Sequence, residues 1–221
     1  MSKIYMPGII ATEGRCATGK STLQKQILMG ALTKLGATVK YFDPEELYPI
    51  IAEENPDDMY DIFKQYPEKG KGKEFLRRTH YIAKPKKRLQ GVRFMRWKYA
   101  DKVCEEMEEN PTDITLTELT TISEEPRLWG NALCRFRTNG SFWKQYINVG
   151  KRNQGGETAM GKLKYIQTVN RAYGGVIKNA KNIDMDINDI FKQGYLAADL
   201  IIQRLQSKKG KHFFFESSSS L

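Results

Sequence analysis

A short glycine-rich segment near the start of the chain combines the residue types that hold a phosphate chain. It fits the pattern G-x-x-x-x-G-K-[ST], with Gly14 and Gly19 at the glycine positions, followed by Lys20 and Ser21. Glycines let backbone N–H groups turn toward phosphate oxygens, a lysine neutralises phosphate charge, and a serine hydroxyl coordinates Mg²⁺. The pattern therefore predicts binding of a nucleoside triphosphate, ATP, with Mg²⁺; the alternative is a chance glycine-rich turn. The predicted nucleotide-binding residues are Gly14, Arg15, Cys16, Ala17, Thr18, Gly19, Lys20, Ser21 and Thr22, with Ser21 as the metal ligand.

The segments on each side of this loop are those that a phosphate site needs. Residues 4–12 are an apolar run typical of a buried strand, and residues 20–35 have the apolar spacing of a helix that stops at Gly36. The positive end of that helix would point at the bound anion. The loop alone does not separate kinases, GTPases and motors. However, the chain has no N-K-x-D motif for guanine and no strand ending in Asp-Glu of the kind typical of ring ATPases.

The rest of the chain alternates between strand and helix patterns. We expect strands at 37–42, 113–119, 144–149 and 182–187, and helices at 45–68, 74–109, 124–137, 163–178 and 188–207. Breaks are expected at Pro49, Pro56, Pro67, Pro85 and Gly91, and basic glycine-containing loops at 69–73 and 150–162. This alternation predicts an α/β fold with a doubly wound parallel sheet flanked by helices, and the phosphate-loop motif makes it a P-loop fold. We expect one domain over 1–207 and a disordered tail over 208–221.

Composition narrows the class of protein. The chain has 221 residues, of which 40% are hydrophobic, so one domain with its own core is expected and a largely disordered chain is excluded. It has no run of 18 apolar residues, so we expect no membrane span, and its start resembles a first strand more than a signal peptide. Three widely spaced cysteines, Cys16, Cys104 and Cys134, form no zinc pattern and favour reduced thiols in the cytoplasm.

The net charge of +10 comes from 36 basic and 26 acidic residues that alternate in blocks. Residues 43–68 sum to −8, residues 69–102 to +11, residues 103–125 to −8 and residues 126–221 to +10. A uniform basic coat for nucleic acid would not alternate in this way. The blocks favour a basic channel for an anionic ligand, flanked by acidic surface.

At five places the sequence resembles the thymidylate kinase and deoxynucleoside kinase branch of the P-loop kinases. These are Glu13-Gly14 through Gly19-Lys20-Ser21-Thr22, Asp43-Pro44, Arg77-Arg78-Thr79-His80, Glu118 with Ser123 five residues later, and 165–173 followed by 182–187. The chain departs from these families at Cys16-Ala17 in the loop and at Leu119, where an arginine usually follows the acid. A second alignment takes 113–126 as a later strand and leaves no acid at the position of Glu118.

The resemblance implies ATP- and Mg²⁺-dependent phosphotransfer to a nucleoside monophosphate or nucleoside, as in nucleotide biosynthesis. It implies that Lys20 and Glu118 are catalytic and that Asp43, Arg77, Arg78 and Ser123 bind the acceptor. Alternatively, Glu118 is a strand-end carboxylate, Asp43 a turn residue, and the two arginines a solvated helix face. His80 is expected to be a packing or surface residue. Members of these families are often homodimers.

A lid is expected over residues 135–162, where glycine hinges and cations occur together. Arg152 is the predicted catalytic residue of this lid, with Lys151, Arg135 and Arg137 as alternatives; a solvated basic loop is the other interpretation. Five aromatic residues could stack on a base, although most are expected in the core: Phe42, Phe75, Tyr81, Trp97 and Trp129.

Two other classes of protein stay open. The first is a P-loop ATPase or polynucleotide kinase that holds nucleic acid with the basic residues and aromatics of 69–102. The second is a nucleotide-binding protein without catalysis, which the absence of arginine beside Glu118 favours.

Overall fold

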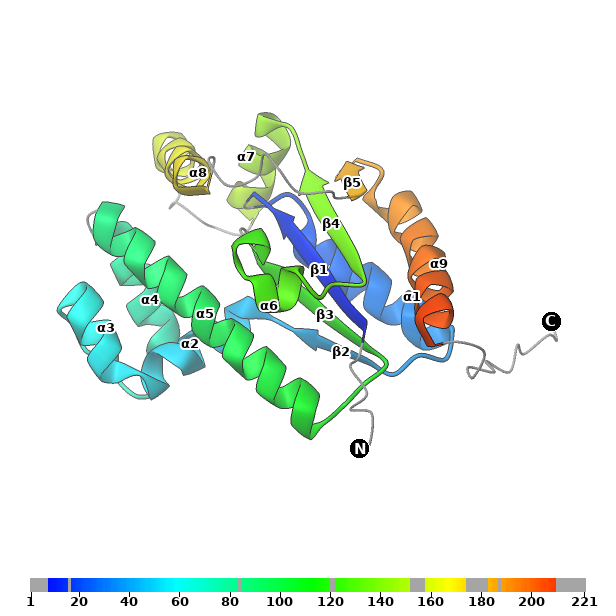
Figure 1. The fold of residues 1–221 in the computed structure, drawn as a ribbon. Helices are drawn as coiled ribbons and strands as arrows, with labels where there is room; N and C mark the ends of the chain where they lie inside the picture. Colours follow the sequence, from blue (N-terminus) through cyan, green and yellow to red (C-terminus); the bar gives the residue numbers. More distant parts are fainter. Residues whose placement is uncertain are drawn as a thin grey trace.

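The computed structural model describes residues 8–15, 17–82, 85–119, 122–151, 158–173, 183–186 and 188–209. Within them, five strands form one parallel sheet in the order β2-β3-β1-β4-β5 (Figure 1). The strands are β1 Gly8–Gly14, β2 Val39–Phe42, β3 Ile114–Leu119, β4 Cys134–Asn139 and β5 Ile183–Asp186. The predicted doubly wound parallel α/β fold is therefore confirmed.

The central strand β1 is paired on both sides. Its residue Thr12 lies opposite Glu118 of β3 and Phe136 of β4. The chain passes from β1 to the outer strand β2, returns through β3, and then crosses to β4 on the other side. Open α/β sheets bind their ligands at such a change of direction, outside the carboxyl ends of the strands, and here that place is the carboxyl end of β1.

One face of the sheet is covered by the helix that follows the phosphate loop and by the last helix. The first consists of a π-helical segment, η1 (Thr22–Leu28), and α1 (Met29–Lys34); the last is α9 (Ile190–Lys209). Ile10, Leu116 and Phe136 of neighbouring strands are fully buried beneath them. Every second side chain of a strand points to the same face of the sheet. Glu118, two residues after Leu116 on β3, therefore also lies on this face.

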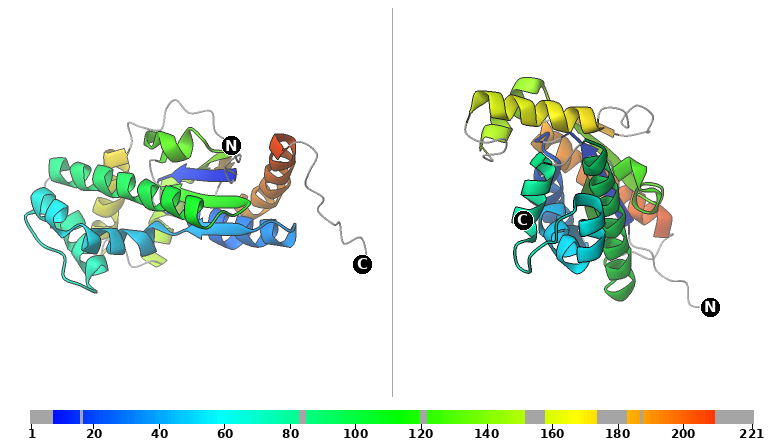
Figure 2. Two further views of the ribbon diagram at one scale, coloured as in Figure 1. Left: turned by 60° about the horizontal axis from the view of Figure 1, so that its bottom comes forward. Right: turned by 90° about the vertical axis from the view of Figure 1, so that its left-hand side faces the viewer.

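The other face carries the middle of the chain. Here lie α2 (Pro44–Glu54), α3 (Pro56–Phe63), α4 (Gly72–Ile82), α5 (Pro85–Glu109), η2 (Ile122–Glu124) and α6 (Pro126–Trp129). Figures 1 and 2 show α2, α3 and α4 gathered around α5, away from α9. Ile9 and Ala11 of β1 face this layer, and they pack in one cluster with Met59 and Tyr99. Two more helices, α7 (Phe142–Lys151) and α8 (Ala159–Tyr173), lie near the carboxyl end of β1.

Several predicted elements were wrong. Residues 124–137 are not one helix, because α6 ends at Trp129 and 134–139 form strand β4. The buried residues Cys134, Phe136 and Thr138 alternate with two arginines, which is the period of a half-buried strand. Residues 144–149 belong to helix α7 and not to a strand, since the buried Gln145 and Val149 are four residues apart.

Two expected breaks are also absent within the described helices. Pro49 lies inside α2 and Gly91 inside α5. Gly91 is the contact point of two helices, because a Cβ atom there would lie 2.3 Å from the ring of Phe63 in α3. Its lack of a side chain therefore permits close packing and does not end the helix. The breaks at Pro56 and Pro85 are confirmed, since each residue begins a helix.

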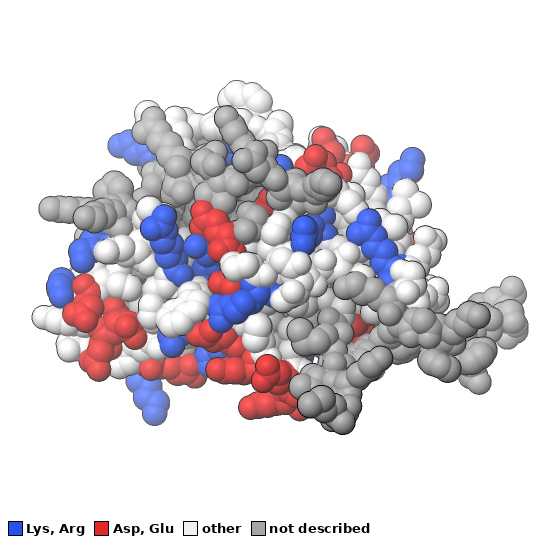
Figure 3. All heavy atoms as spheres, viewed as in Figure 1, with Lys and Arg blue, Asp and Glu red and all other residues white. Residues whose placement is uncertain are grey.

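Some residues of the basic block 69–102 pair with the acidic blocks on either side. Arg96 pairs with Glu124, Lys102 with Glu54, and Lys71 with Glu68. On the face seen in Figure 3, basic and acidic side chains lie next to one another. The basic block at 69–102 is therefore partly neutralised by the acidic blocks on either side of it in the sequence. No helix of the described segments has the length and apolar character needed to cross a membrane.

Candidate functional site

The phosphate loop follows β1 at the carboxyl edge of the sheet, and its backbone has conformations that a phosphate cradle requires. Gly19 has φ +91° and Ala17 has φ +59°, both in the left-handed region. Gly14 is packed against β4, because a Cβ atom there would lie 2.3 Å from Thr138 Oγ1 and 2.6 Å from the Thr138 carbonyl oxygen. Only glycine fits at this position without movement of β4.

Side chains hold the loop in place from inside. Thr18 Oγ1 donates to the Arg15 carbonyl over 2.8 Å and lies 2.8 Å from Thr138 Oγ1. Lys20 Nζ donates to the same Arg15 carbonyl over 3.2 Å. The lysine is thus folded over the loop, where its charge faces the space in which phosphates would lie. Cys16 lies outside the described residues.

The first hydroxyl of the following helix meets the carboxylate at the end of β3. Ser21 Oγ donates to Glu118 Oε1 over 2.6 Å. Glu118 is only 4% exposed, and its Oε2 atom has no hydrogen-bond partner within the described part of the chain. Burial raises the pKa of Glu118, while the charge of Lys20 acts in the opposite direction. A buried carboxylate with an uncommitted oxygen, beside a serine hydroxyl, is a suitable partial shell for a metal ion.

Asp43 and Tyr41 complete this side of the site from β2. Asp43 caps α2 by accepting the Glu45 N–H over 2.9 Å, and it pairs with Lys25 over 3.4 Å. Tyr41 lies on the same sheet face, and its buried hydroxyl makes no hydrogen bond among the described residues. Burial, together with the charges of Glu118 and Asp43, raises the pKa of Tyr41, so its hydroxyl remains neutral.

A buried ion pair lies on the opposite face of β1, one residue before the loop. Glu13 is 0% exposed and accepts two hydrogen bonds from Arg137, at 3.1 Å from Nε and 2.8 Å from a terminal nitrogen. The two residues are direct neighbours in the pairing of β1 with β4. Arg135, two residues earlier, donates to the carbonyls of Trp129 and Gly130. Arg135 and Arg137, the two alternatives for the lid residue that lie on β4, thus already bind groups of the neighbouring segments.

Helix α7 contacts the phosphate loop directly. Asn148 Nδ2 donates to the Ala17 carbonyl over 3.1 Å, and Ala17 packs in a small cluster with Val149 and with Ile166 of α8. Of the residues expected to form the lid, 135–139 belong to strand β4 of the sheet, whereas α7 lies against the phosphate loop. Lys151 is exposed at the end of α7. Arg152, the predicted lid residue, lies outside the described residues.

The predicted acceptor-binding arginines lie on α4. Arg77 and Arg78 are exposed, and Arg78 forms an ion pair with Glu74 on its own helix. Ser123 belongs to η2, but its side chain lies outside the described residues, as do those of His80 and Tyr81. The structure brings Asp43 close to Glu118 but does not bring Arg78 into contact with either.

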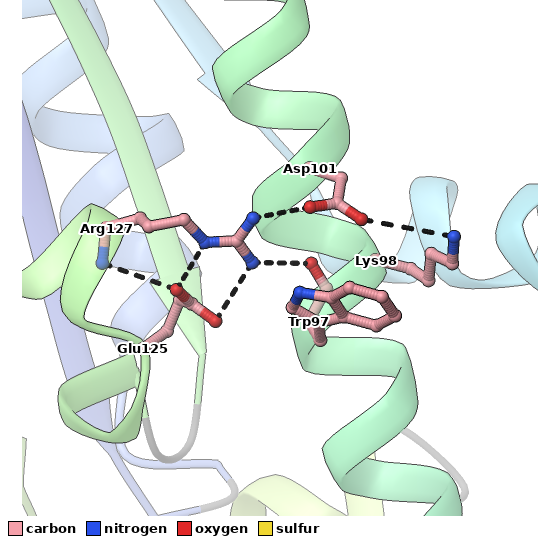
Figure 4. A network of polar contacts seen from close by, with 5 residues as sticks. All are labelled: Trp97, Lys98, Asp101, Glu125 and Arg127. Carbon is pink, nitrogen blue, oxygen red and sulfur yellow. Dashed lines mark hydrogen bonds and ion pairs between the residues drawn. The ribbon is translucent and has the colours of Figure 1, made fainter.

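A network of charges fastens the loop after β3 to α5 (Figure 4). Arg127 lies between Glu125 and Asp101, with its Nε 2.7 Å from Glu125 Oε1, and it donates to the Trp97 carbonyl over 3.1 Å. Glu125 is 5% exposed. The charge and hydrogen bonds of Glu125 and Asp101 raise the pKa of Arg127, so the cation is permanent.

The aromatic residues considered for base stacking have mostly structural positions. Phe42, Phe75 and Trp129 belong to the core, whereas Trp97 is 52% exposed with Lys98 Nζ 4.9 Å from its ring centre. Four residues near the loop were not predicted from sequence: Gln24, Tyr41, Thr138 and Asn148. Tyr41 could have been found, because it lies two residues before the predicted Asp43, which directly follows strand β2.

Within the described ranges, no group of three His, Cys, Asp or Glu side chains could hold a metal ion by itself. Mg²⁺ does not need such a group, because it is usually bound by one or two protein ligands together with phosphates and water. Ser21 Oγ and the uncommitted oxygen of Glu118 fit that requirement.

The sequence matches no family model and no curated protein. The fold is similar to that of TT1252 from Thermus thermophilus, with a TM-score of 0.57 and 16% identity over 89% of this chain and 97% of that one. A sugar kinase from Janibacter sp. HTCC2649 aligns with a TM-score of 0.47, 12% identity, and 93% and 99% of the two chains covered. A gluconokinase from Sinorhizobium meliloti 1021 gives 0.45, 12%, and 93% and 99%. The first likeness shows a shared fold, and the other two are too weak to add to it.

Proposed function

We propose that this protein is an ATP- and Mg²⁺-dependent kinase of the thymidylate kinase-like type, which phosphorylates a nucleoside monophosphate or a nucleoside. The observation that carries the proposal is the hydrogen bond between Ser21 and Glu118 beside the phosphate loop. It joins the predicted metal ligand to the predicted catalytic acid, although the two are 97 residues apart in sequence.

On the donor side, the residues of the loop would hold the triphosphate. Backbone N–H groups of the loop and the start of the helix favour its negative charge, and Lys20 adds a mobile cation. Ser21 and Glu118 are the residues that would hold Mg²⁺, and the ion would supply positive charge to compensate that of the transferred group. Phosphotransfer needs alignment and charge compensation more than covalent help, and both can come from these groups.

On the acceptor side, the carboxylates that the proposal uses are Glu118 and Asp43. Either could accept a hydrogen bond from an acceptor hydroxyl or take its proton. In this proposal Arg77, Arg78 and Ser123 bind an acceptor phosphate, which for Arg78 requires exchange of its exposed ion pair with Glu74. Exposed pairs of this kind are weak, so such an exchange costs little.

Arg152 remains our candidate for the lid, with Lys151 second. The position of α7 supports this choice, because Asn148 and Val149 attach the helix to the phosphate loop. Arg135 and Arg137 are less suited, because their guanidinium groups are already bound to backbone carbonyls and to Glu13.

The test is a coupled ADP-release screen with four classes of acceptor: nucleoside monophosphates, nucleosides, simple sugars, and oligonucleotides with a free 5′-hydroxyl. We expect turnover with a member of the first two classes. A Lys20→Ala variant should lose about 10²–10³-fold in kcat/KM, as is usual when one charge-stabilising donor is removed.

The screen also separates the alternatives. Turnover with oligonucleotides alone would favour a protein that acts on nucleic acid. The basic block on α4 and α5 gives this alternative limited support, because it is partly paired with acidic residues. ATP binding without turnover on any acceptor would favour a non-catalytic nucleotide-binding protein. Full activity in Lys20→Ala would contradict the proposal outright.

A further inference from the structure

A buried phenol borders the Ser21–Glu118 pair and is not used by the mechanism above. Tyr41 lies on the same sheet face as Glu118, and its buried hydroxyl makes no hydrogen bond in the described structure. Glu118 Oε2, the carboxylate oxygen that Ser21 does not contact, likewise has no hydrogen-bond partner in the described structure. Two complementary polar atoms, one donor and one acceptor, are thus buried close together without hydrogen bonds.

Both atoms reach this position because of strand register. Tyr41 lies opposite Leu116 in the pairing of β2 with β3, so Tyr41, Leu116 and Glu118 belong to one sheet face. The same face carries η1, and Lys25 of that helix lies 5.8 Å from the centre of the Tyr41 ring. The ring is therefore held between β2 and η1 with its hydroxyl at the carboxyl edge.

Leaving a hydroxyl buried without a partner costs stability, so such a group needs an explanation, for example a bound ion, a water or a functional role. Tyr41 is a neutral hydrogen donor, and Glu118 can accept from two directions. Ser21 already occupies one carboxylate oxygen. The Tyr41 hydroxyl is therefore a suitable donor for Glu118 Oε2, the carboxylate oxygen that Ser21 does not contact.

We propose that Tyr41 is a positioning residue for the metal site, which donates its hydroxyl hydrogen to Glu118 when Mg²⁺ and nucleotide are bound. Ser21 and Tyr41 then hold the carboxylate from two sides and fix the orientation in which it meets the metal or its water. This role rests on the proposed function, because it assumes that Mg²⁺-nucleotide binds at the phosphate loop. Partners that orient a metal-binding carboxylate commonly affect metal affinity strongly.

The experiment measures the affinity for ADP by calorimetry, with Mg²⁺ and with EDTA, in wild type, Tyr41→Phe and Tyr146→Phe. Tyr146 is a suitable control because it is a partly buried tyrosine that packs beside Ala17, on the other side of the loop. In Tyr41→Phe we expect the gain in affinity from Mg²⁺ to fall about ten- to hundredfold, the effect of one hydrogen bond to a charged group. Affinity in EDTA should not change, and Tyr146→Phe should behave as wild type.

Two further measurements separate positioning from a structural role. In a Glu118→Gln background, Tyr41→Phe should have no additional effect on the response to Mg²⁺, because the two residues act through one contact. The melting temperature of the ligand-free Tyr41→Phe protein should be equal to that of wild type or higher, because a buried unpartnered hydroxyl is removed.

An unchanged response to Mg²⁺ in Tyr41→Phe, or an equal loss of affinity with and without Mg²⁺, would overturn the role of Tyr41 and leave the proposed kinase function intact. A wild-type protein whose affinity for ADP does not respond to Mg²⁺ would overturn both. Failure of the acceptor screen, with normal Mg²⁺-dependent binding, would count against the kinase function alone.

Discussion

Ser21 and Glu118 are joined by a hydrogen bond of 2.6 Å between the first turn of the helix after the phosphate loop and the end of β3. The contact fixes the orientation of the Glu118 carboxylate. Burial disfavours the ionised form of Glu118 and raises its pKa, so the stability of the fold depends on the ionisation of this group.

A Glu118→Gln variant tests this coupling. A carboxyl group whose pKa is higher in the folded than in the unfolded chain stabilises the fold most below its ordinary value of 4.5, and this contribution is lost as pH rises through the raised pKa. Glutamine cannot ionise, so in Mg²⁺-free buffer the variant should match wild type near about pH 4 and be more stable near about pH 7. Urea unfolding at both pH values measures this difference. The exposed Glu108→Gln is the control, and an equal gain there would refute the explanation.

Gly14 is predicted to be intolerant of any side chain. In Gly14→Ala the new methyl group would collide with Thr138, and the backbone has φ +155°. We expect a loss of about 1–3 kcal/mol in the free energy of unfolding, together with loss of ADP binding. Gly30→Ala is the matched control, because no atom lies within 4 Å of the new Cβ and the site is in helix α1. It should be neutral or stabilising by up to about 1 kcal/mol, and a similar loss in both variants would contradict the steric argument.

The Glu13–Arg137 pair is predicted to be a strong local determinant of stability. Arg137→Ala removes the guanidinium group that compensates a carboxylate with 0% exposure, which should cost about 3–5 kcal/mol. Replacing both residues, as Glu13→Gln with Arg137→Met, should recover most of this loss because no charge then remains buried. Arg78→Ala, which breaks the exposed pair with Glu74, should cost less than about 1 kcal/mol. Chemical denaturation would measure all three.

The network around Arg127 is predicted to hold the loop after β3 in place. Arg127→Ala leaves the nearly buried Glu125 without its closest cation, so we expect destabilisation by about 1–3 kcal/mol and faster hydrogen exchange in η2 and α6. The peripheral Lys98→Ala, whose ion pair with Asp101 is 4.0 Å long, should change stability by less than about 1 kcal/mol. If exchange in the loop is the same in both variants, the network does not restrain it.

The parts of the fold that were predicted correctly are those with local signals. The phosphate loop, its strand and its helix are adjacent in sequence, and β3 and β5 are short segments in which apolar residues alternate with polar ones. Strand β4 was missed because Arg135 and Arg137 interrupt its apolar residues. Their engagement depends on Trp129 and Glu13, partners that only the folded sheet brings together.

The candidate site was predictable only in part for the same reason. Ser21 and Glu118 each carry a motif signal, but their contact depends on the register of β1 with β3. Tyr41 and Asn148 belong to no motif, and their positions follow from strand alternation and from the packing of α7 on the loop. Side chains that act through neighbours distant in sequence leave little trace in local patterns.

The position of β1 between β3 and β4 has a consequence for how the protein is made. The phosphate loop leaves the ribosome early, yet its strand pairs only with residues 114–119 and 134–139. A nascent chain that ends before these segments carries an apolar strand without its neighbours and a Ser21 without Glu118. Contacts between distant segments form slowly and leave such strands open to aggregation in the meantime. The proposed nucleotide site can therefore be completed only late in synthesis, after both neighbours of the central strand have been made.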